Sequence, residues 1–228
     1  SFKRDRDVVL TALAKNGWLI YYADDSLKRD RDVVLAAVAQ NGWALKEVDD
    51  SLKRDRDVVL AAVAHHGVAL KYAADKSLKR DRDFVLQAVK LQGRALKYAD
   101  ARFKGDVEIV LEAVAQDADA FSFAHRLLKR NRDVVLKAVA HDGNAFEFAD
   151  DSLKRDRDVV LKAVALHSAA YLYVGDDRLE RDPRVVLTAL TRFCAESVAR
   201  AADYALSRTS AVLQRRFSAS KKKKTTSA

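Results

Sequence analysis

Residues 55–67 read DRDVVLAAVAHHG, and this stretch decides the fold because the rest of the chain repeats it. Apolar residues recur in it at the spacing of one helix face, alanine is abundant, and a capping residue precedes the first turn. The pattern predicts an α-helix of about three turns that ends at Gly67, where glycine is expected to adopt left-handed backbone. A shorter second helix is expected over 68–73, followed by a polar turn that leads to Leu78.

The same unit occurs eight times along the chain. The leucine that closes each Val-Val-Leu-like triplet recurs every 25 residues, with two single insertions. These anchor leucines are Leu10, Leu35, Leu60, Leu86, Leu111, Leu136, Leu161 and Leu187. Self-similarity at such a period is the mark of a stacked repeat array. We therefore expect an all-α protein, a right-handed or superhelical α-solenoid of eight two-helix repeats with a C-terminal capping helix.

The period also sets the domain organisation. We expect one array over 1–217 and a basic flexible tail over 218–228. The repeats are expected near 2–26, 27–51, 52–77, 78–102, 103–127, 128–152, 153–178 and 179–217. In the last repeat Cys194 replaces glycine, so 195–217 can form one long capping helix with Val198 on its inward stripe. Because Phe2 already occupies a repeat position in a chain without Met, we expect the chain to begin inside a longer gene product.

Composition excludes several classes of function. With 49% hydrophobic residues, one Pro and seven Gly among 228 residues, the chain is expected to be ordered. Cys194 is the only cysteine, which excludes an intramolecular disulfide and fits a reducing compartment, either the cytoplasm or an organelle interior. The sequence contains no apolar run of about 18 residues, so no membrane span is expected.

Catalytic and metal-binding patterns are missing from the sequence. His65 and His66 are adjacent and therefore point in different directions on a helix, and the other histidines lie two or more repeats away, too far to share a metal. No glycine-rich phosphate loop occurs, and no Ser or Cys nucleophile stands near a base. We expect no enzyme, no metal, no cofactor and no small-molecule substrate.

A capping residue stands five positions before each anchor leucine, from Asp5 to Asp182. Such side chains accept hydrogen bonds from the unpaired amides of the first turn, a contribution of about 0.5–2 kcal/mol each. An arginine precedes the cap in seven repeats, at Arg4, Arg29, Arg54, Arg80, Arg130, Arg155 and Arg181. This row of arginines could bind a polyanion, with Arg29, Arg54 and Arg80 as candidate anion contacts. We favour pairing with acidic neighbours instead, because carboxylates are about as numerous as bases.

A second repeated row is aromatic. Twelve residues after the anchor stand Tyr22, Tyr72, Tyr98, Phe123, Phe148 and Tyr173, with Glu47 as the exception. Aromatic rows can stack nucleic-acid bases. The row lies on the alanine-rich face of the second helix, so we favour packing between successive repeats.

Positions that vary between repeats indicate what the surface does, because packing does not fix them. Five, eight and eleven residues after the anchor, the side chains are aromatic near the N-terminus, then basic, then polar to acidic, and finally apolar. The candidate protein interface consists of Trp18, Tyr21, Trp43, Lys46, Lys71, Arg94 and Lys97. The aromatic members are either exposed interface anchors, or core residues, or covered by residues upstream; the anchor hypothesis and its alternatives stay open.

The net charge of +9 belongs mainly to the C-terminal segment. Residues 201–228 carry seven basic residues and one acidic residue, whereas the first 200 residues carry 35 and 32, a net charge of only +3. The four consecutive lysines are Lys221, Lys222, Lys223 and Lys224. They could contact RNA, DNA, an anionic membrane surface or an import receptor; we favour a solvated, disordered terminus.

Residues 35–45, LAAVAQNGWAL, resemble the short two-helix repeat called domain of unknown function 4116. The resemblance extends over about 2–175, with departures in the fifth and eighth repeats, and it implies a tandem array without established catalytic residues. We expect a non-catalytic protein–protein interaction scaffold that binds other protein subunits, for example as an accessory structural subunit of a larger, organellar complex. The alternatives are nucleic-acid or ribonucleoprotein binding through the lysine tail and arginine edge, and a simple link between domains of a longer protein.

Overall fold

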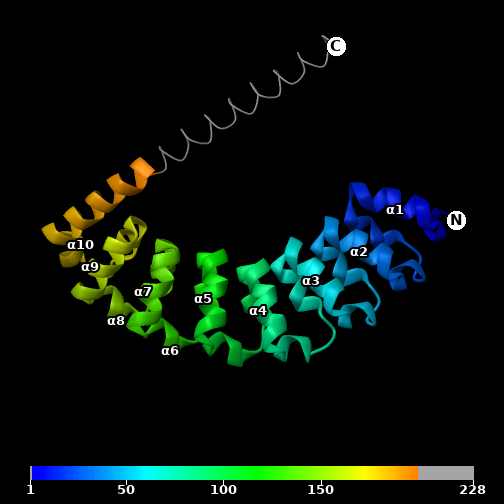
Figure 1. Ribbon diagram of the computed structural model, residues 1–228, viewed down its shortest axis with the longest axis horizontal. Helices are drawn as coiled ribbons and strands as arrows, with labels where there is room; N and C mark the ends of the chain where they lie inside the picture. Colours follow the sequence, from blue (N-terminus) through cyan, green and yellow to red (C-terminus); the bar gives the residue numbers. More distant parts are fainter. Residues whose placement is uncertain (1, 200–228) are drawn as a thin grey trace, which may run out of the picture.

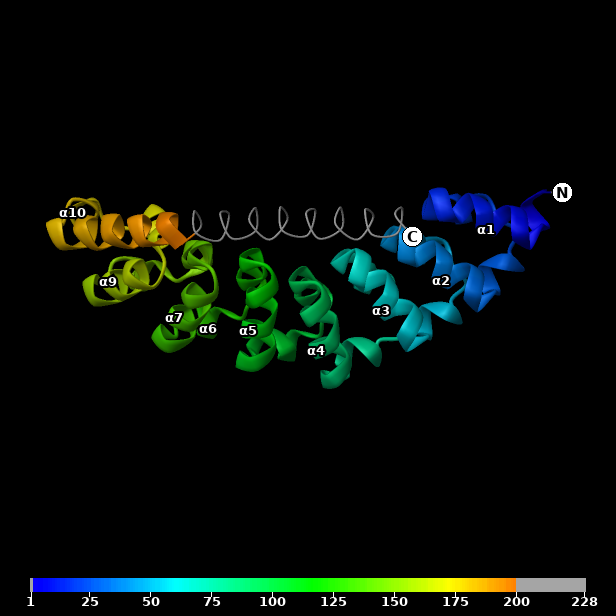
Figure 2. The ribbon, with the colours of Figure 1, turned by 45° about the horizontal axis from the view of Figure 1, so that its top comes forward.

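The computed structural model describes residues 2–199, which form a curved array of helical pairs (Figure 1). Each pair joins a ten-residue α-helix to a six-residue 3-10 helix, and residues 2–199 contain no strand. Both ends of the described array rise on the same side of the arc, and the arc is also visible in the tilted view of Figure 2. The prediction of an all-α, solenoid-like repeat array is confirmed.

The helices form two layers along the arc. The ten-residue α-helices are α1 (Arg6–Lys15), α2 (Arg31–Gln40), α3 (Arg56–His65), α4 (Arg82–Leu91), α5 (Val107–Gln116), α7 (Arg132–His141) and α9 (Arg157–Leu166). The 3-10 helices are η2 (Gly17–Tyr22), η4 (Gly42–Glu47), η6 (Gly67–Tyr72), η8 (Gly93–Tyr98), η10 (Ala118–Phe123), η11 (Gly143–Phe148) and η12 (Ser168–Tyr173). Successive α-helices contact one another, and so do successive 3-10 helices.

A short helical turn precedes each α-helix. These turns are η1 (Phe2–Arg4), η3 (Leu27–Arg29), η5 (Leu52–Arg54), η7 (Leu78–Arg80), η9 (Ala101–Gly105), α6 (Arg126–Lys129), α8 (Asp151–Lys154) and α10 (Asp177–Glu180). After the 3-10 turns the next residue is the cap of the following helix, and after α6, α8 and α10 the cap stands one residue further on. In α3, for example, the Asp55 side chain accepts hydrogen bonds from the amides of Asp57 and Val58, at 2.9 and 3.1 Å.

The prediction of eight capping residues is confirmed. Seven of them cap the ten-residue α-helices through side-chain oxygens: Asp5, Asp30, Asp55, Asp81, Asp106, Asn131 and Asp156. The eighth, Asp182, accepts a hydrogen bond from the amide of Arg184 at 2.8 Å. Because these caps satisfy amides that the helix itself leaves unpaired, they fix where each α-helix begins.

The repeated glycine does not end the α-helix in left-handed backbone, and that prediction was wrong. The helix is broken one residue earlier by an extended residue, as at His66 with φ −152°, and no glycine in residues 2–199 has a positive φ. Gly42 instead begins η4 and lies against the next repeat. A Cβ atom there would meet the carbonyl oxygen of Ala62 far closer than the 3.4 Å of ordinary contact. Glycine is therefore required because backbones of adjacent repeats approach closely.

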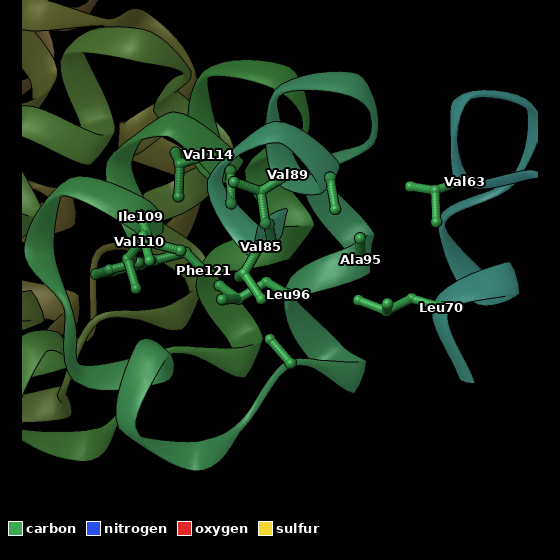
Figure 3. Packing of buried hydrophobic residues seen from close by; sticks show 14 of the residues in the cluster. Val63, Leu70, Val85, Val89, Ala95, Leu96, Ile109, Val110, Val114 and Phe121 are labelled. Atoms are coloured by element: carbon green, nitrogen blue, oxygen red, sulfur yellow. The ribbon is translucent and has the colours of Figure 1, made fainter. Parts of the chain in front are cut away.

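The hydrophobic core is continuous through the described array. Each six-residue 3-10 helix from η2 to η11 contributes one fully buried large side chain, such as Leu70, Leu96 and Phe121, whereas Tyr171 of η12 is only partly buried. Figure 3 shows Val63 and Leu70 of the third repeat pointing toward Ala95 and Leu96 of the fourth. Within residues 2–199 no polar or charged residue is buried. Since each repeat buries its apolar surface only against its neighbours, stability arises from nearest-neighbour contacts.

The eighth repeat departs from the pattern. An α-helix begins at Pro183 and continues without a break to 199, so no separate capping helix begins at 195 as expected. Its Glu196 carboxylate accepts a hydrogen bond from the hydroxyl of Ser168 at 2.5 Å, which joins the helix to η12. Val198, expected on the inward stripe, is 70% exposed. Residues 200–217 of the expected cap and the tail over 218–228 lie outside the described residues.

Candidate interaction surface

The arginines that precede the caps lie beside carboxylates. Four of them form ion pairs with an aspartate 20 residues later: Arg4 with Asp24, Arg29 with Asp49, Arg80 with Asp100 and Arg130 with Asp150, at 2.8, 3.0, 3.2 and 3.5 Å. Arg155 instead donates to the carbonyl oxygen of Gly175 at 3.1 Å. Arg54 lies close enough to Asp75 to contribute, after two hydrogen bonds from Ser77, to the lowered pKa of that carboxyl. Of the candidate anion contacts, Arg29 and Arg80 are therefore already neutralised within the array.

A second set of arginines joins neighbouring repeats, and the sequence reasoning missed it. Arg31, the first residue of α2, donates from Nε to Asp55 at 2.9 Å and from Nη2 to Asp57 at 2.8 Å. The aspartates are the cap and second helical residue of the next repeat. The same arrangement is made by Arg6 and Arg82, and single contacts are made by Arg56 and Arg157. The signal lay in the Asp-Arg-Asp unit recurring every 25 residues.

The arginine–aspartate ion pairs predict that the stability of the fold depends on pH in the acid range. Hydrogen bonding to Arg4 and Ser26 lowers the pKa of Asp24 from 3.8 to about 2, and hydrogen bonds from Arg6 and Arg31 lower the pKa of Asp30 and Asp55. Because these pKa values are lower in the folded state, the stabilisation is complete above about pH 4 and is lost as the pH falls toward 2. We expect the melting temperature, followed by circular dichroism, to fall steeply between pH 4 and pH 2. A melting temperature that stays constant over this interval would contradict the assignment.

Three lysines of the candidate interface occupy the same position in successive repeats. Lys46, Lys71 and Lys97 are exposed residues of η4, η6 and η8, three 3-10 helices that contact one another in order. The Nζ atom of Lys71 lies 5.8 Å from the ring centroid of Tyr72. Lys97 lies over two rings, 5.6 Å from Tyr98 and 5.7 Å from the next repeat's Phe123. Among the described residues neither Lys71 nor Lys97 forms an ion pair, whereas Lys46 lies 3.6 Å from Glu47.

The aromatic candidates lie at or near the surface. Trp43 is 36% exposed and packs edge-on against His66, with ring centroids 5.7 Å apart, and at a tilt against Tyr72 at 6.1 Å. Tyr21 is 52% exposed, and Trp18 is half-buried. Because Trp43 contacts the following repeat on one side and solvent on the other, it has both a packing role and a free ring surface.

Arg94 differs from the other basic candidates. Its guanidinium donates to Asp117 at 2.6 Å and also forms a very short contact with Asp119, so its charge is satisfied within the array. It borders a groove of about 480 Å³ whose lining also includes Val68, Lys97 and Phe123. In this groove the available cation is Lys97, and Arg94 serves to join the fourth and fifth repeats.

The repeated aromatic row packs against the core, as favoured. Five of its rings are partly buried: Tyr72, Tyr98, Phe123, Phe148 and Tyr173. Tyr22 is 57% exposed because no described repeat precedes it. These five rings therefore contact the core on their inner side, and their outer side reaches the surface.

A second, apolar groove lies at the C-terminal end of the described array. It has a volume of about 810 Å³ between η12 and the helix that begins at Pro183, and it is lined by Leu172, Leu190 and Phe193 among others. Elsewhere in the array each 3-10 helix is covered by the next one. The eighth repeat continues as an α-helix instead, so residues 2–199 cover the corresponding surface of η12 only in part.

No group of three or more His, Cys, Asp or Glu side chains in residues 2–199 is placed to hold a metal ion. Over the same residues, every helix is too short or too polar to cross a membrane.

This fold and surface define a helical repeat protein of the α-solenoid type. The family described as Domain of unknown function (DUF4116) matches residues 5–53, 30–79, 55–104, 81–129 and 131–180, and the chain belongs to this family. Each match spans two successive 25-residue units, in agreement with a unit that buries its apolar face only against a neighbour. No curated protein and no solved structure matches the chain.

Proposed function

We propose that the chain is a non-catalytic protein–protein interaction scaffold, acting as an accessory structural subunit of a larger complex. The observation that carries this proposal is that the positions repeated in every unit and the positions that vary between units lie in different places. The repeated positions are buried, like Leu70, or paired, like Arg31, whereas the variable positions on the 3-10 helices reach the surface. A rigid array with a varied outer face can bind a specific partner without supplying any chemistry.

The residue types on this face support the same proposal. Trp43 and Tyr21 present ring surface, and Lys71 and Lys97 present cations that rest on aromatic rings. Aromatic residues are enriched at protein interfaces because they offer a large contact area with few rotatable bonds. An organellar setting for the complex remains part of the proposal.

The test compares wild type with a Trp18→Ala/Trp43→Ala variant in affinity purification followed by mass spectrometry. We expect the principal partner to be depleted at least tenfold, because truncating a central aromatic anchor costs about 2 kcal/mol or more of binding energy. Lys137→Ala/Lys162→Ala is the matched control, since both lysines are exposed on α7 and α9, away from this face. Circular dichroism checks that both variants fold. A partner recovered equally with all three proteins would refute the assigned surface.

The second candidate function is nucleic-acid or ribonucleoprotein binding. It is favoured by the seven basic residues among 201–228, which include Lys221–Lys224. The pairing of Arg29 and Arg80 with aspartates removes part of the support that the arginine edge would give. RNA binding of this kind would weaken steeply with salt and would be lost with Lys221–Lys224→Ala.

A further inference from the structure

We infer that the lysine–ring row, defined as Lys46, Lys71 and Lys97 with the rings of Trp43, Tyr72 and Tyr98, binds an acidic, proline-rich segment of a partner protein in the polyproline II conformation. This inference rests on the proposed scaffold function and names the class of partner. The inference follows from the spacing of the lysines, from the residue types in the row and from the repeat at which the row ends.

The spacing of the row matches one turn of a polyproline II helix. The three lysines stand at equivalent positions of η4, η6 and η8, which pack side by side, so they repeat at the separation of packed helices, about 8–10 Å. Polyproline II has three residues per turn and rises about 3.1 Å per residue, or about 9 Å per turn. Every third side chain of such a segment therefore faces the row, one for each repeat.

The chemistry of the row combines cations with ring surface. Lys71 and Lys97 have no carboxylate partner among the described residues, and each ammonium is held over an aromatic ring. A carboxylate at every third position of the segment would meet these ammonium groups. In the same row, Trp43 and Tyr72 offer tilted rings whose centroids are 6.1 Å apart, the type of surface on which proline rings pack in polyproline II recognition. Because the bound segment is already extended when free, little conformational entropy is lost.

The row has a defined C-terminal limit. At the position of Lys97, the next two repeats carry Ser122 and Glu147. The groove of about 480 Å³ is lined by both Lys97 and Glu147. The Glu147 carboxylate would repel an acidic segment, so binding is confined to the second, third and fourth repeats.

Single-stranded nucleic acid fits the row less well. Stacking a whole base needs a fully open ring face, whereas Tyr72 and Tyr98 are partly buried and each lies beside a lysine, which leaves surface suited to a smaller proline ring. The carboxylate of Glu147 would also repel the phosphates of a longer strand. A protein segment, which can end at Lys97, avoids both conflicts.

The experiment uses the full chain and fluorescein-labelled peptides followed by fluorescence anisotropy. The peptides are (Glu-Pro-Pro)4, (Glu-Gly-Gly)4 with the same charge on a flexible backbone, and (Lys-Pro-Pro)4 with the opposite charge; an oligothymidylate of twelve nucleotides is the fourth probe. We expect (Glu-Pro-Pro)4 to bind at least tenfold more tightly than (Glu-Gly-Gly)4, and (Lys-Pro-Pro)4 not to bind. Lys71→Glu/Lys97→Glu should weaken the first complex at least tenfold.

Lys137→Glu/Lys162→Glu is the control, because it changes the net charge equally on α7 and α9. Measurements repeated with Lys221–Lys224→Ala separate the row from the basic residues of 201–228. Equal affinity for the two acidic peptides, an affinity unchanged by Lys71→Glu/Lys97→Glu, or tighter binding of the oligothymidylate through these lysines would each overturn the inference. If the peptides fail to bind while Trp18→Ala/Trp43→Ala still releases a protein partner, the scaffold function stands and only this inference falls.

Discussion

Gly93→Ala is expected to lower the free energy of unfolding by about 1–3 kcal/mol or more, although it adds only one methyl group. The added Cβ atom would meet the carbonyl oxygen of Ala113 far inside contact distance, and it would lie 3.2 Å from Cβ of Asp117. The oxygen belongs to the backbone of α5 and cannot rotate away. Relief therefore requires the fourth and fifth repeats to move apart, which exposes the apolar surface between them.

Gly105→Ala is the matched control for this prediction. At Gly105 the closest atom to an added Cβ is Cβ of His125, at 3.9 Å, which is ordinary contact. The substitution should leave stability unchanged or raise it by about 0.4–1 kcal/mol, because alanine restricts the unfolded chain. Urea denaturation followed by circular dichroism measures both variants. Equal midpoints for Gly93→Ala and Gly105→Ala would show that the close approach of the repeats is not what requires glycine.

The glycine also shows why the sequence alone misassigned part of the repeat. A glycine after a helix is commonly its left-handed cap, and nothing within one repeat argues otherwise. The residue that actually breaks α3 is His66, in extended backbone, and the constraint on Gly42 comes from Ala62 in the next repeat. Local patterns therefore predicted where the helices begin, at caps such as Asp55. They could not show what lies against the glycine, because that depends on how repeats stack.

The candidate site shows the same division between local and non-local information. Variation between repeats predicted that Lys71 and Lys97 lie at the surface, since nothing in the packing fixes those positions. It could not separate them from Arg94, whose charge is taken up by Asp117 and Asp119 more than twenty residues away. It also could not place Lys97 over the rings of two repeats. Those relations appear only when successive 3-10 helices are brought side by side.

Leu96→Ala is expected to lower the free energy of unfolding by about 2–5 kcal/mol, because it removes a fully buried side chain and leaves a cavity. Leu172→Ala, the same substitution at a leucine that is 75% exposed, should change stability by less than about 0.5 kcal/mol. Leu96 lies between the third and fifth repeats, facing Leu70 and near Phe121 (Figure 3). Since neighbours alone stabilise each repeat, the cavity should also weaken coupling between the two ends of the array. Hydrogen exchange of Leu96→Ala should therefore show faster exchange in α4 and its neighbours than in α1 and α2. Uniformly accelerated exchange along the chain would instead mean that the array unfolds as a single cooperative unit.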